Sequence, residues 1–492
     1  MRTKTKITIL CSAVALLAMG SSMNAMAAQA GWVQEGGTWT YVDSQGNRLT
    51  DSWRKSGNYW FYLDSNGEMA VDQWVDDTSY VDINGVRVTN QWIYVEPGTD
   101  SAPNPDGGWY YFDASGNAAA DDWRTINGRR YYFDSDGTMK YGWFTDNEDL
   151  YYLGDENQGW AATGWLCLDY DPDNPPEDGD VSYVETAGSE TAKWFYFQAN
   201  GKAVRAVNET YRNRTINGNR YYFDENGVML TGWVSVASDS DASDPTGIST
   251  FKYFGDANDG SMSRGWKYLT DHPEDSNDSG NIGTATSSEI SSYENVDGSW
   301  YYFDSNGTPK YLDATATNMS EATSQINGRR YFFDEYGRMQ YGLIGVDFGD
   351  GTIQSAYFGN SDSDGQMKTD RTTNVTEDSG DRSTFYFQAS GSSRGAGYTG
   401  ERQHYLYWNG KLVRAEQGTG VQVFEVNGTL YLLNEAGRIQ DNNRCYRSEG
   451  DYRYEYADGT IYYVDADRQR IGEVTSGENL PDVSYKTVYT LN

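Results

Sequence analysis

The sequence predicts an all-β protein built as a solenoid of stacked β-hairpins. One unit occurs three times, as INGRRYYFDSDGTMKYGW at 126–143, INGNRYYFDENGVMLTGW at 216–233 and INGRRYFFDEYGRMQYGL at 326–343. Side chains of a strand alternate between two faces, and the aromatic and charged residues of the unit alternate with that period of two. A lone hairpin is marginal in water, so repeated hairpins must stack on their neighbours.

Each unit contains a candidate chain reversal. In the first unit it is Asp136-Gly137, two residue types that tolerate positive φ. We expect 130–134 to form one strand and 138–141 to return as the second strand of the hairpin. Because stacked hairpins contact mainly their neighbours, we expect ligands to bind in the seams between them.

Composition narrows the classes of function. The chain has 15% aromatic residues, 54 glycines and a mean hydropathy of −0.76, so we expect no large aliphatic core. Residues 1–27 carry three basic and no acidic side chains, so the remainder has 35 basic and 72 acidic residues and a net charge of −37. Such a chain repels nucleic acid and attracts cations.

The N-terminus resembles an export signal. Three basic residues precede an apolar run at 7–19, and small residues follow. We expect a signal peptide at 1–27 with cleavage after Ala27, or alternatively after Ala30. No second apolar stretch is long enough to span a membrane, and LPDVS at 480–484 lacks the features of a sortase signal. The sequence therefore predicts a secreted protein whose retention at a cell wall or surface, if it is retained there, is non-covalent.

Repeat spacing divides the rest of the chain into three regions. Residues 28–143 are short aromatic hairpin repeats, in which tryptophans recur about every twenty positions and a Pro/Gly/Asp insertion interrupts them once, at 96–108. Residues 144–440 are longer composite repeats with acidic loop insertions. Residues 441–492 are a degenerate repeat and a C-terminal cap.

These repeats resemble a known family. The pattern W-x-Y-(V/L)-D-S-x-G at 39 and 60, WYYFDASG at 109 and the terminal Gly-Trp pairs are similar to the cell-wall-binding, or choline-binding, repeats of Gram-positive surface proteins. The variants with Arg in place of the first Trp, such as NGRRYYFDSDG, look more like glucan-binding repeats and clostridial toxin receptor-binding repeats. The resemblance implies a left-handed hairpin solenoid that binds choline-substituted teichoic acid or a cell-surface glycan.

The resemblance also implies where ligand binds. A quaternary ammonium has no hydrogen-bond donor, so aromatic faces recognise it through cation–π attraction. Family sites combine the Trp of one hairpin, the Trp that follows it and a Tyr of the next hairpin. Carried over to this sequence, the ligand-binding residues are Trp39, Trp53 and Tyr62; Trp60, Trp74 and Tyr80; and Trp109, Trp123 and Tyr132.

Other seams lack a complete set under this rule. Arg130, Arg220 and Arg330 stand where a hairpin Trp would be, so these seams are either glycan sites or structural. Trp194 has no following Gly-Trp, and Trp300 is followed by Tyr-Leu. We therefore expect cation-binding capacity in the N-terminal units.

The remaining motifs argue against catalysis and metal binding. Acidic loops at 171–180, 238–244 and 271–280 lack EF-hand spacing, so we expect solvated loops rather than Ca²⁺ sites. His272 and His404 have no Cys or Ser motif beside them, and HExxH, GxSxG and P-loop patterns are missing. We expect no enzyme activity and no cofactor. Two alternatives stay open: a surface adhesin that binds host glycans or proteins with the repeats as scaffold, and a wall hydrolase hidden in the acidic insertions.

Overall fold

The computed structural model describes residues 30–99, 101–183, 191–237, 242–270, 298–448 and 453–491. They form strands β1 to β36 and one 3-10 turn, η1 (Ile248–Thr250), which confirms the predicted all-β class and the hairpin architecture. The predicted signal peptide at 1–27 lies outside the described residues. No helix in the described part of the chain has the length and apolar character needed to cross a bilayer.

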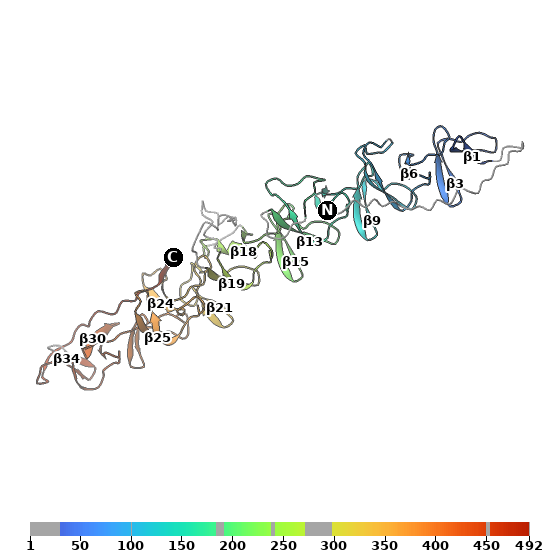
Figure 1. Cartoon of the computed structure of the whole chain (residues 1–492). Helices are drawn as coiled ribbons and strands as arrows, with labels where there is room; N and C mark the ends of the chain where they lie inside the picture. The colour runs from blue at the N-terminus through green and yellow to red at the C-terminus, as the bar shows by residue number, and fades with distance from the viewer. Residues whose placement is uncertain are drawn as a thin grey trace. The chain divides into compact units, whose positions relative to one another are not determined.

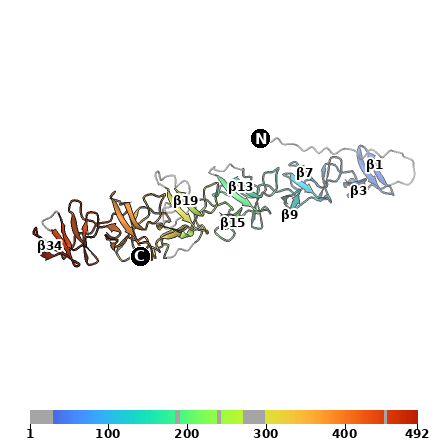
Figure 2. The ribbon, with the colours of Figure 1, turned by 90° about the horizontal axis from the view of Figure 1, so that it is seen from below.

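The chain divides into two compact units, and unit 1 comprises residues up to Val207 together with 225–229. Each odd-numbered strand of unit 1 pairs with the next strand as an antiparallel hairpin, and the hairpins follow one another in chain order (Figures 1 and 2). The strands of unit 1 are β1 (Gly31–Glu35), β2 (Thr38–Val42), β3 (Ser52–Ser56), β4 (Tyr59–Leu63), β5 (Gln73–Val75), β6 (Ser79–Val81), β7 (Gln91–Val95), β8 (Gly108–Phe112), β9 (Asp122–Ile126), β10 (Arg129–Phe133), β11 (Trp143–Asp146), β12 (Asp149–Tyr152), β13 (Gly164–Asp169) and β14 (Ala192–Phe197).

Unit 2 comprises residues 208–224 and 230–492 and begins with hairpins of the same kind. Its strands are β15 (Arg212–Ile216), β16 (Asn219–Phe223), β17 (Trp233–Ser235), β18 (Phe251–Tyr253), β19 (Gly265–Leu269), β20 (Ser299–Phe303), β21 (Ser324–Ile326), β22 (Arg329–Tyr331), β23 (Leu343–Asp347), β24 (Ile353–Tyr357), β25 (Asp370–Thr376), β26 (Arg382–Phe387), β27 (Gly400–Arg402), β28 (Tyr405–Trp408), β29 (Lys411–Leu412), β30 (Val421–Val426), β31 (Thr429–Asn434), β32 (Arg444–Arg447), β33 (Arg453–Ala457), β34 (Thr460–Val464), β35 (Arg470–Glu473) and β36 (Thr487–Thr490).

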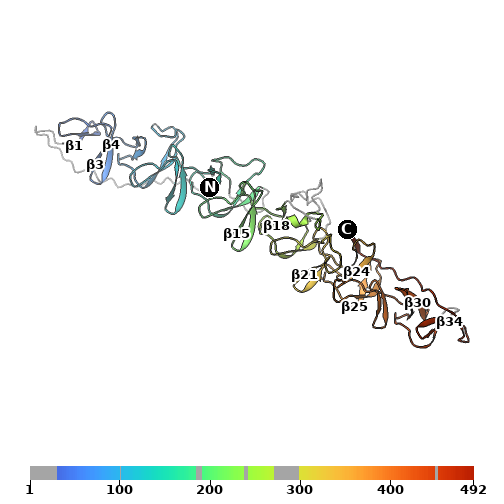
Figure 3. The ribbon, with the colours of Figure 1, turned by 180° about the vertical axis from the view of Figure 1, so that it is seen from behind.

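The later part of unit 2 contains wider sheets. Strands β25 to β29 form a five-stranded sheet, and β32 to β35 form a four-stranded one. After β35 the chain returns toward the region of β24 (Figure 3), and β36 pairs with β23 in parallel, so that β23 lies between β24 and β36. The predicted divisions at 143 and 440 describe repeat composition and stay predictions.

The position of the hairpin turn differs from our expectation. The regular hairpin of the first repeated unit is β9–β10, in which Asp122 pairs with Phe133. Its turn is Asn127-Gly128, with φ of 50° and 79°, the two positive values that a type I′ turn requires. The expected return strand at 138–141 is wrong, because beyond β10 the chain makes only an isolated bridge between Phe133 and Met139.

An aspartate that follows many of the hairpins explains this second reversal. The Oδ1 atom of Asp64 accepts the backbone amides of Asn66 and Glu68 at 2.8 and 2.9 Å, and Gly67 takes a φ of 77°. The carboxylate closes a loop too tight for a second strand. The same pair of bonds recurs at Asp43, Asp82, Asp113, Asp304, Asp334 and Asp465.

Tryptophans join several of the hairpins to the next one. Trp74 of β5 is paired in register with Tyr80 of β6, and its ring packs on Tyr110 and Phe112 of the following hairpin at 4.9 and 5.3 Å. We call this arrangement the aromatic quartet. It recurs as Trp92–Tyr111–Tyr131–Phe133, Trp143–Tyr152–Phe195–Phe197, Trp233–Tyr253–Tyr301–Phe303 and Trp266–Tyr302–Tyr331–Phe333.

Removal of a quartet tryptophan should destabilise the fold strongly. Trp143 is 2% exposed and its Nε1 donates to Ser182 Oγ at 2.8 Å. We expect Trp143→Ala to lower the free energy of unfolding by about 3–5 kcal/mol, the cost of deleting a buried large aromatic side chain. Trp60→Ala, at a ring that is 43% exposed, should cost less than about 1 kcal/mol. Urea titrations followed by circular dichroism test this, and equal losses would contradict it.

Candidate functional site: aromatic seams

The first predicted group is only partly brought together. Trp53 and Tyr62 face each other in the β3–β4 hairpin with ring centroids 5.2 Å apart. The Arg87 guanidinium lies over the Trp53 ring at 4.6 Å, and Trp53 Nε1 donates to Asp76 at 2.7 Å. Trp39 contributes no ring contact to this pair among the described residues. A cation from the chain itself therefore covers Trp53.

Arg87 takes this place because the following hairpin has a gap. Where other quartets have an aromatic ring such as Tyr110, this seam has Ser79, which is fully buried. The Ser79 hydroxyl accepts from Arg87 Nη2 at 2.9 Å, and Asn117 Oδ1 accepts from the same nitrogen at 3.1 Å. The guanidinium thus fills the volume of a missing ring and stabilises the seam from inside.

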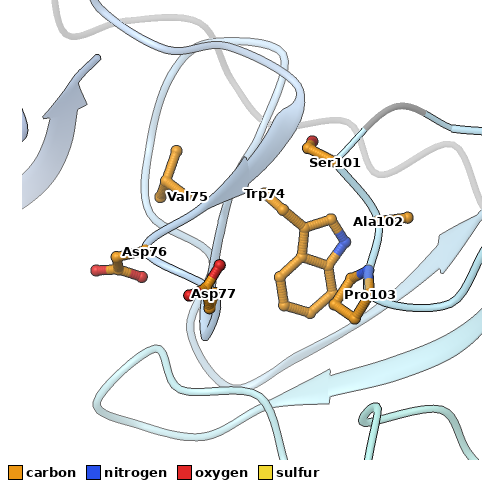
Figure 4. A pocket seen from close by; sticks show the side chains of 7 residues that line it. All are labelled: Trp74, Val75, Asp76, Asp77, Ser101, Ala102 and Pro103. Atoms are coloured by element: carbon orange, nitrogen blue, oxygen red, sulfur yellow. The ribbon is translucent and has the colours of Figure 1, made fainter. Parts of the chain in front are cut away.

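The second predicted group contains a core residue. Trp74 is 6% exposed and packs on Tyr80, Tyr110 and Phe112. The insertion predicted as a loop passes beside it, and Figure 4 shows Pro103 next to the indole at the edge of a cavity of about 440 Å³. Trp60 is largely exposed and has no ring contact with Trp74 among the described residues. Trp74 is therefore buried between two hairpins and does not form the wall of an open cage.

The third predicted group resembles the first. Trp123 pairs with Tyr132 at 5.4 Å and packs on Tyr151 of the next hairpin at 4.6 Å. The Arg130 guanidinium lies over the Trp123 ring at 4.1 Å. Trp109 belongs to a different cluster, which it shares with Trp92. The place that a ligand cation would take on Trp123 is occupied by Arg130.

The tyrosines of these groups stay protonated at neutral pH. Burial raises the pKa of Tyr62, and the carboxylates of Asp51 and Asp76 add to the effect. Burial also raises the pKa of Tyr132, and for Tyr80 it acts together with a hydrogen bond that the phenol donates to Asp72. The rings therefore offer neutral π faces, and recognition of a cation does not rest on a phenolate.

The structure assembles a different set of tryptophans. Trp92 and Trp109 of the β7–β8 hairpin have ring centroids 6.5 Å apart and ring planes at 83°. Two further pairs have the same geometry and, like the first, are partly exposed to solvent. They are Trp165–Trp194, at 6.3 Å and 85°, and Trp266–Trp300, at 6.4 Å and 82°. We call these three sets the perpendicular tryptophan pairs.

Each perpendicular pair is bounded by one copy of the repeated unit. The carbonyl oxygens of Trp109, Trp194 and Trp300 accept the amides of Met139, Met229 and Met339, each at 2.8 Å. Met139 and Met339 are buried in the same clusters as their tryptophan pairs. Two planar rings at right angles, with a thioether nearby, form the corner of an aromatic cage that suits a quaternary ammonium.

Sequence reasoning missed these pairs for a traceable reason. It joined each hairpin Trp to the Trp that follows it, whereas Trp109 meets Trp92, which precedes it across the same hairpin. The hairpin loops that contain 96–107, 170–191 and 270–298 separate the two rings of each pair in sequence. The signal was present as a Trp before each insertion and a second Trp directly after it. Two of the three pairs lie beyond residue 143, outside the units in which we expected cation binding.

The described residues contain no group of three His, Cys, Asp or Glu side chains that could hold a metal ion. In the acidic loop at 171–180, Asp171 caps a turn by accepting the amide of Asp173. The loop at 271–280 and residues 238–241 of the second acidic loop lie outside the described residues, as does His272.

Comparison with known proteins agrees with this architecture. Models of choline-binding repeats match 120–165 and 213–243, and models of putative cell-wall-binding repeats match 51–69, 106–118 and 292–308. The chain is 26% identical over 254 residues to glucosyltransferase-S of Streptococcus mutans, a match that covers 46% of this chain and 15% of that protein.

Similar solved structures include two proteins of Streptococcus pneumoniae. The modular autolysin LytC, in complex with a synthetic peptidoglycan ligand, has 19% identity and a TM-score of 0.35, and the match covers 65% of this chain and 55% of that one. Choline-binding protein F has 20% identity and a TM-score of 0.37, with 71% and 98% covered.

The fold and its seams define a hairpin-repeat protein whose neighbouring hairpins share aromatic rings. The repeats at the matched positions fit the models of choline-binding and cell-wall-binding repeats, which confirms the resemblance that the sequence predicts.

Exposing Trp123 should create a new cation site. Arg130→Ala removes the guanidinium from the Trp123 face and leaves Tyr132 and Tyr151 beside an open ring. We expect the number of choline molecules bound per chain to rise by one in calorimetric titration. Arg124→Ala is the control, since Arg124 belongs to the same hairpin and pairs with Asp122. An unchanged number for Arg130→Ala would show that the guanidinium is not what closes this seam.

Proposed function

We propose that this chain is a secreted, non-catalytic protein that attaches to choline-bearing polymers of a bacterial cell surface, such as choline-substituted teichoic acid. Attachment is non-covalent and uses the three perpendicular tryptophan pairs. Several weak sites on one chain bind a polymer with many choline groups more tightly than any single site does.

One observation carries the proposal. Where the chain covers a tryptophan with its own guanidinium, as at Trp53 and Trp123, a cation already fills the place that choline would take. In the perpendicular pairs the two rings instead meet at about a right angle and stay partly exposed. Cation–π contact with such rings contributes about 0.5–2 kcal/mol per ring, depending on how far it is desolvated.

The family supports the same assignment. Repeats that match choline-binding and cell-wall-binding models support location at a cell wall. The net charge of −37 on residues 28–492 raises the local concentration of cationic groups near the protein. Because the cation–π contact between the ligand and the rings of a cage is short-ranged, binding depends only modestly on salt.

A glycan ligand is the second candidate. The likeness to glucosyltransferase-S supports it, as do the arginines at the hairpin Trp position, whose guanidinium donors match sugar hydroxyls. The adhesin alternative, in which the repeats are a scaffold for binding host glycans or proteins, shares this chemistry. A titration with glycans separates it from choline binding.

Loss of one tryptophan of a perpendicular pair should remove one site. We expect Trp300→Phe to reduce the number of bound choline molecules by one or to weaken that site at least fivefold, because the smaller ring is a poorer cation–π partner. Trp60→Phe is the matched control, since Trp60 occupies the same hairpin position without a perpendicular partner. Calorimetry with choline measures both variants. If the two variants bind choline equally well, the perpendicular tryptophan pairs are not the choline sites.

The non-catalytic part of the proposal needs a separate experiment. The full chain, renatured in a gel that contains bacterial cell walls, should produce no cleared band, because we assign the repeats to binding alone. A wall hydrolase on the same gel is the positive control. A cleared band at the mass of the chain would place a hydrolase in the acidic insertions.

A further inference from the structure

A second cavity of unit 1 has a chemistry unlike that of the cages. It has a volume of about 420 Å³ and lies against the β9–β10 hairpin. Its lining includes Arg129, Arg130, Gln158, Trp160 and Asn200, and none of its lining residues is acidic. Residues 28–492 carry a net charge of −37. A cavity lined by two guanidiniums and no carboxylate is therefore opposite in charge to most of this part of the chain.

Arg129 has no partner of its own in the part of the chain that the structure describes. Its guanidinium carbon lies 3.7 Å from the centre of the Trp160 ring, but the described residues supply no ion pair or hydrogen bond for its donors. Its neighbour Arg130 is held on Trp123, and its Nη1 donates to the carbonyl oxygen of Asn200 at 2.7 Å. Elsewhere in the same hairpin, Arg124 is paired with Asp122.

Stacking prepares Arg129 to bind an anion. Contact with Trp160 uses the face of the guanidinium, whereas its five N–H donors lie in the plane and stay available. Holding the plane on an aromatic ring reduces the entropy that the side chain loses when a ligand binds. A planar fork of donors matches a carboxylate or phosphate in a bidentate geometry.

We propose that this cavity binds the oxyanion of an acidic sugar, with Arg129 as the principal donor and Trp160 as its support. The cavity volume falls in the range of about 300–1,000 Å³ that is usual for small ligands, which is enough for a sugar ring that carries a carboxylate or a phosphate. Arg130 supplies a second positive charge at the same wall. Gln158 and Asn200 supply polar groups for sugar hydroxyls.

The other copies of the repeated unit do not repeat this arrangement. A hydrogen bond that recurs in all three copies allows them to be aligned: the amides of Ala161, Met262 and Met367 donate to the carbonyl oxygens of Arg130, Arg220 and Arg330. The partners that match Arg129 and Trp160 are therefore Asn219 with Ser261 in the second unit and Arg329 with Gln366 in the third. The stacked arginine is a property of the first unit.

Three sugars that differ at one carbon test the proposal: glucose, glucuronate and glucose 6-phosphate. The full chain is titrated with each in saturation-transfer NMR, and with choline in parallel. We expect saturable binding of glucuronate, glucose 6-phosphate or both, and none of glucose. Binding of one acid alone identifies which oxyanion the cavity takes.

Two matched variants locate the site. Arg129→Gln should weaken binding of the acidic sugar at least tenfold, whereas Arg329→Gln, at the corresponding position without a tryptophan, should leave it unchanged. Choline binding should be the same in both variants, which shows that they are folded and keeps this result separate from the choline proposal. The proposal is overturned by equal binding of all three sugars, by no binding of either acid, or by equal losses in the two variants.

Discussion

The structure depends on one contact, the stacking of a strand tryptophan on the aromatic pair of the next hairpin. A two-stranded hairpin cannot bury both of its faces by itself, so each hairpin must pack one face against its neighbour. Trp74 shows how this is done: it is paired with Tyr80 inside its own hairpin and packs on Tyr110 and Phe112 of the next. Since each ring serves two hairpins, the aromatic residues form the core of these hairpins. Later in unit 2 the core is largely aliphatic, as at Ile344 and Val346, which the composition did not lead us to expect.

The turns explain part of the acidity. In each repeat that ends with an aspartate such as Asp64, the carboxylate accepts two backbone amides and holds a tight reversal after the hairpin. At Asp43 these bonds lower the pKa, the amide of Asn47 first, so the group stays ionised at neutral pH. A repeat that uses one carboxylate per turn accumulates negative charge as it is copied. Part of the net charge is therefore a consequence of the architecture before any ligand is considered.

The sequence predicts the fold well and the site less well, for a physical reason. Period-two alternation and the repeated unit suffice to predict stacked hairpins, because both are local properties. Strand pairing is not local: Trp266 and Trp300 are adjacent in space but separated by a long hairpin loop. The turn was misplaced for a similar reason, since Asn127-Gly128 and Asp136-Gly137 both suit reversal, and only the strand register decides which one joins two strands.

Arginines that lie over indole rings decide which aromatic faces stay open. Where a seam lacks a ring, as at Ser79, Arg87 fills the gap and covers Trp53, and Arg130 covers Trp123 in the same way. A guanidinium in the chain and a quaternary ammonium in solution compete for the same negative face of the indole. Replacing the hairpin Trp of a repeat by Arg therefore has two effects. It removes one aromatic ring of a cage, and it places a guanidinium over the ring that remains. We propose that copies of a single hairpin unit in this way serve as scaffold or as cation cage. Where the arginine stacks on a ring at an open cavity, as Arg129 does on Trp160, the proposed site takes the opposite charge.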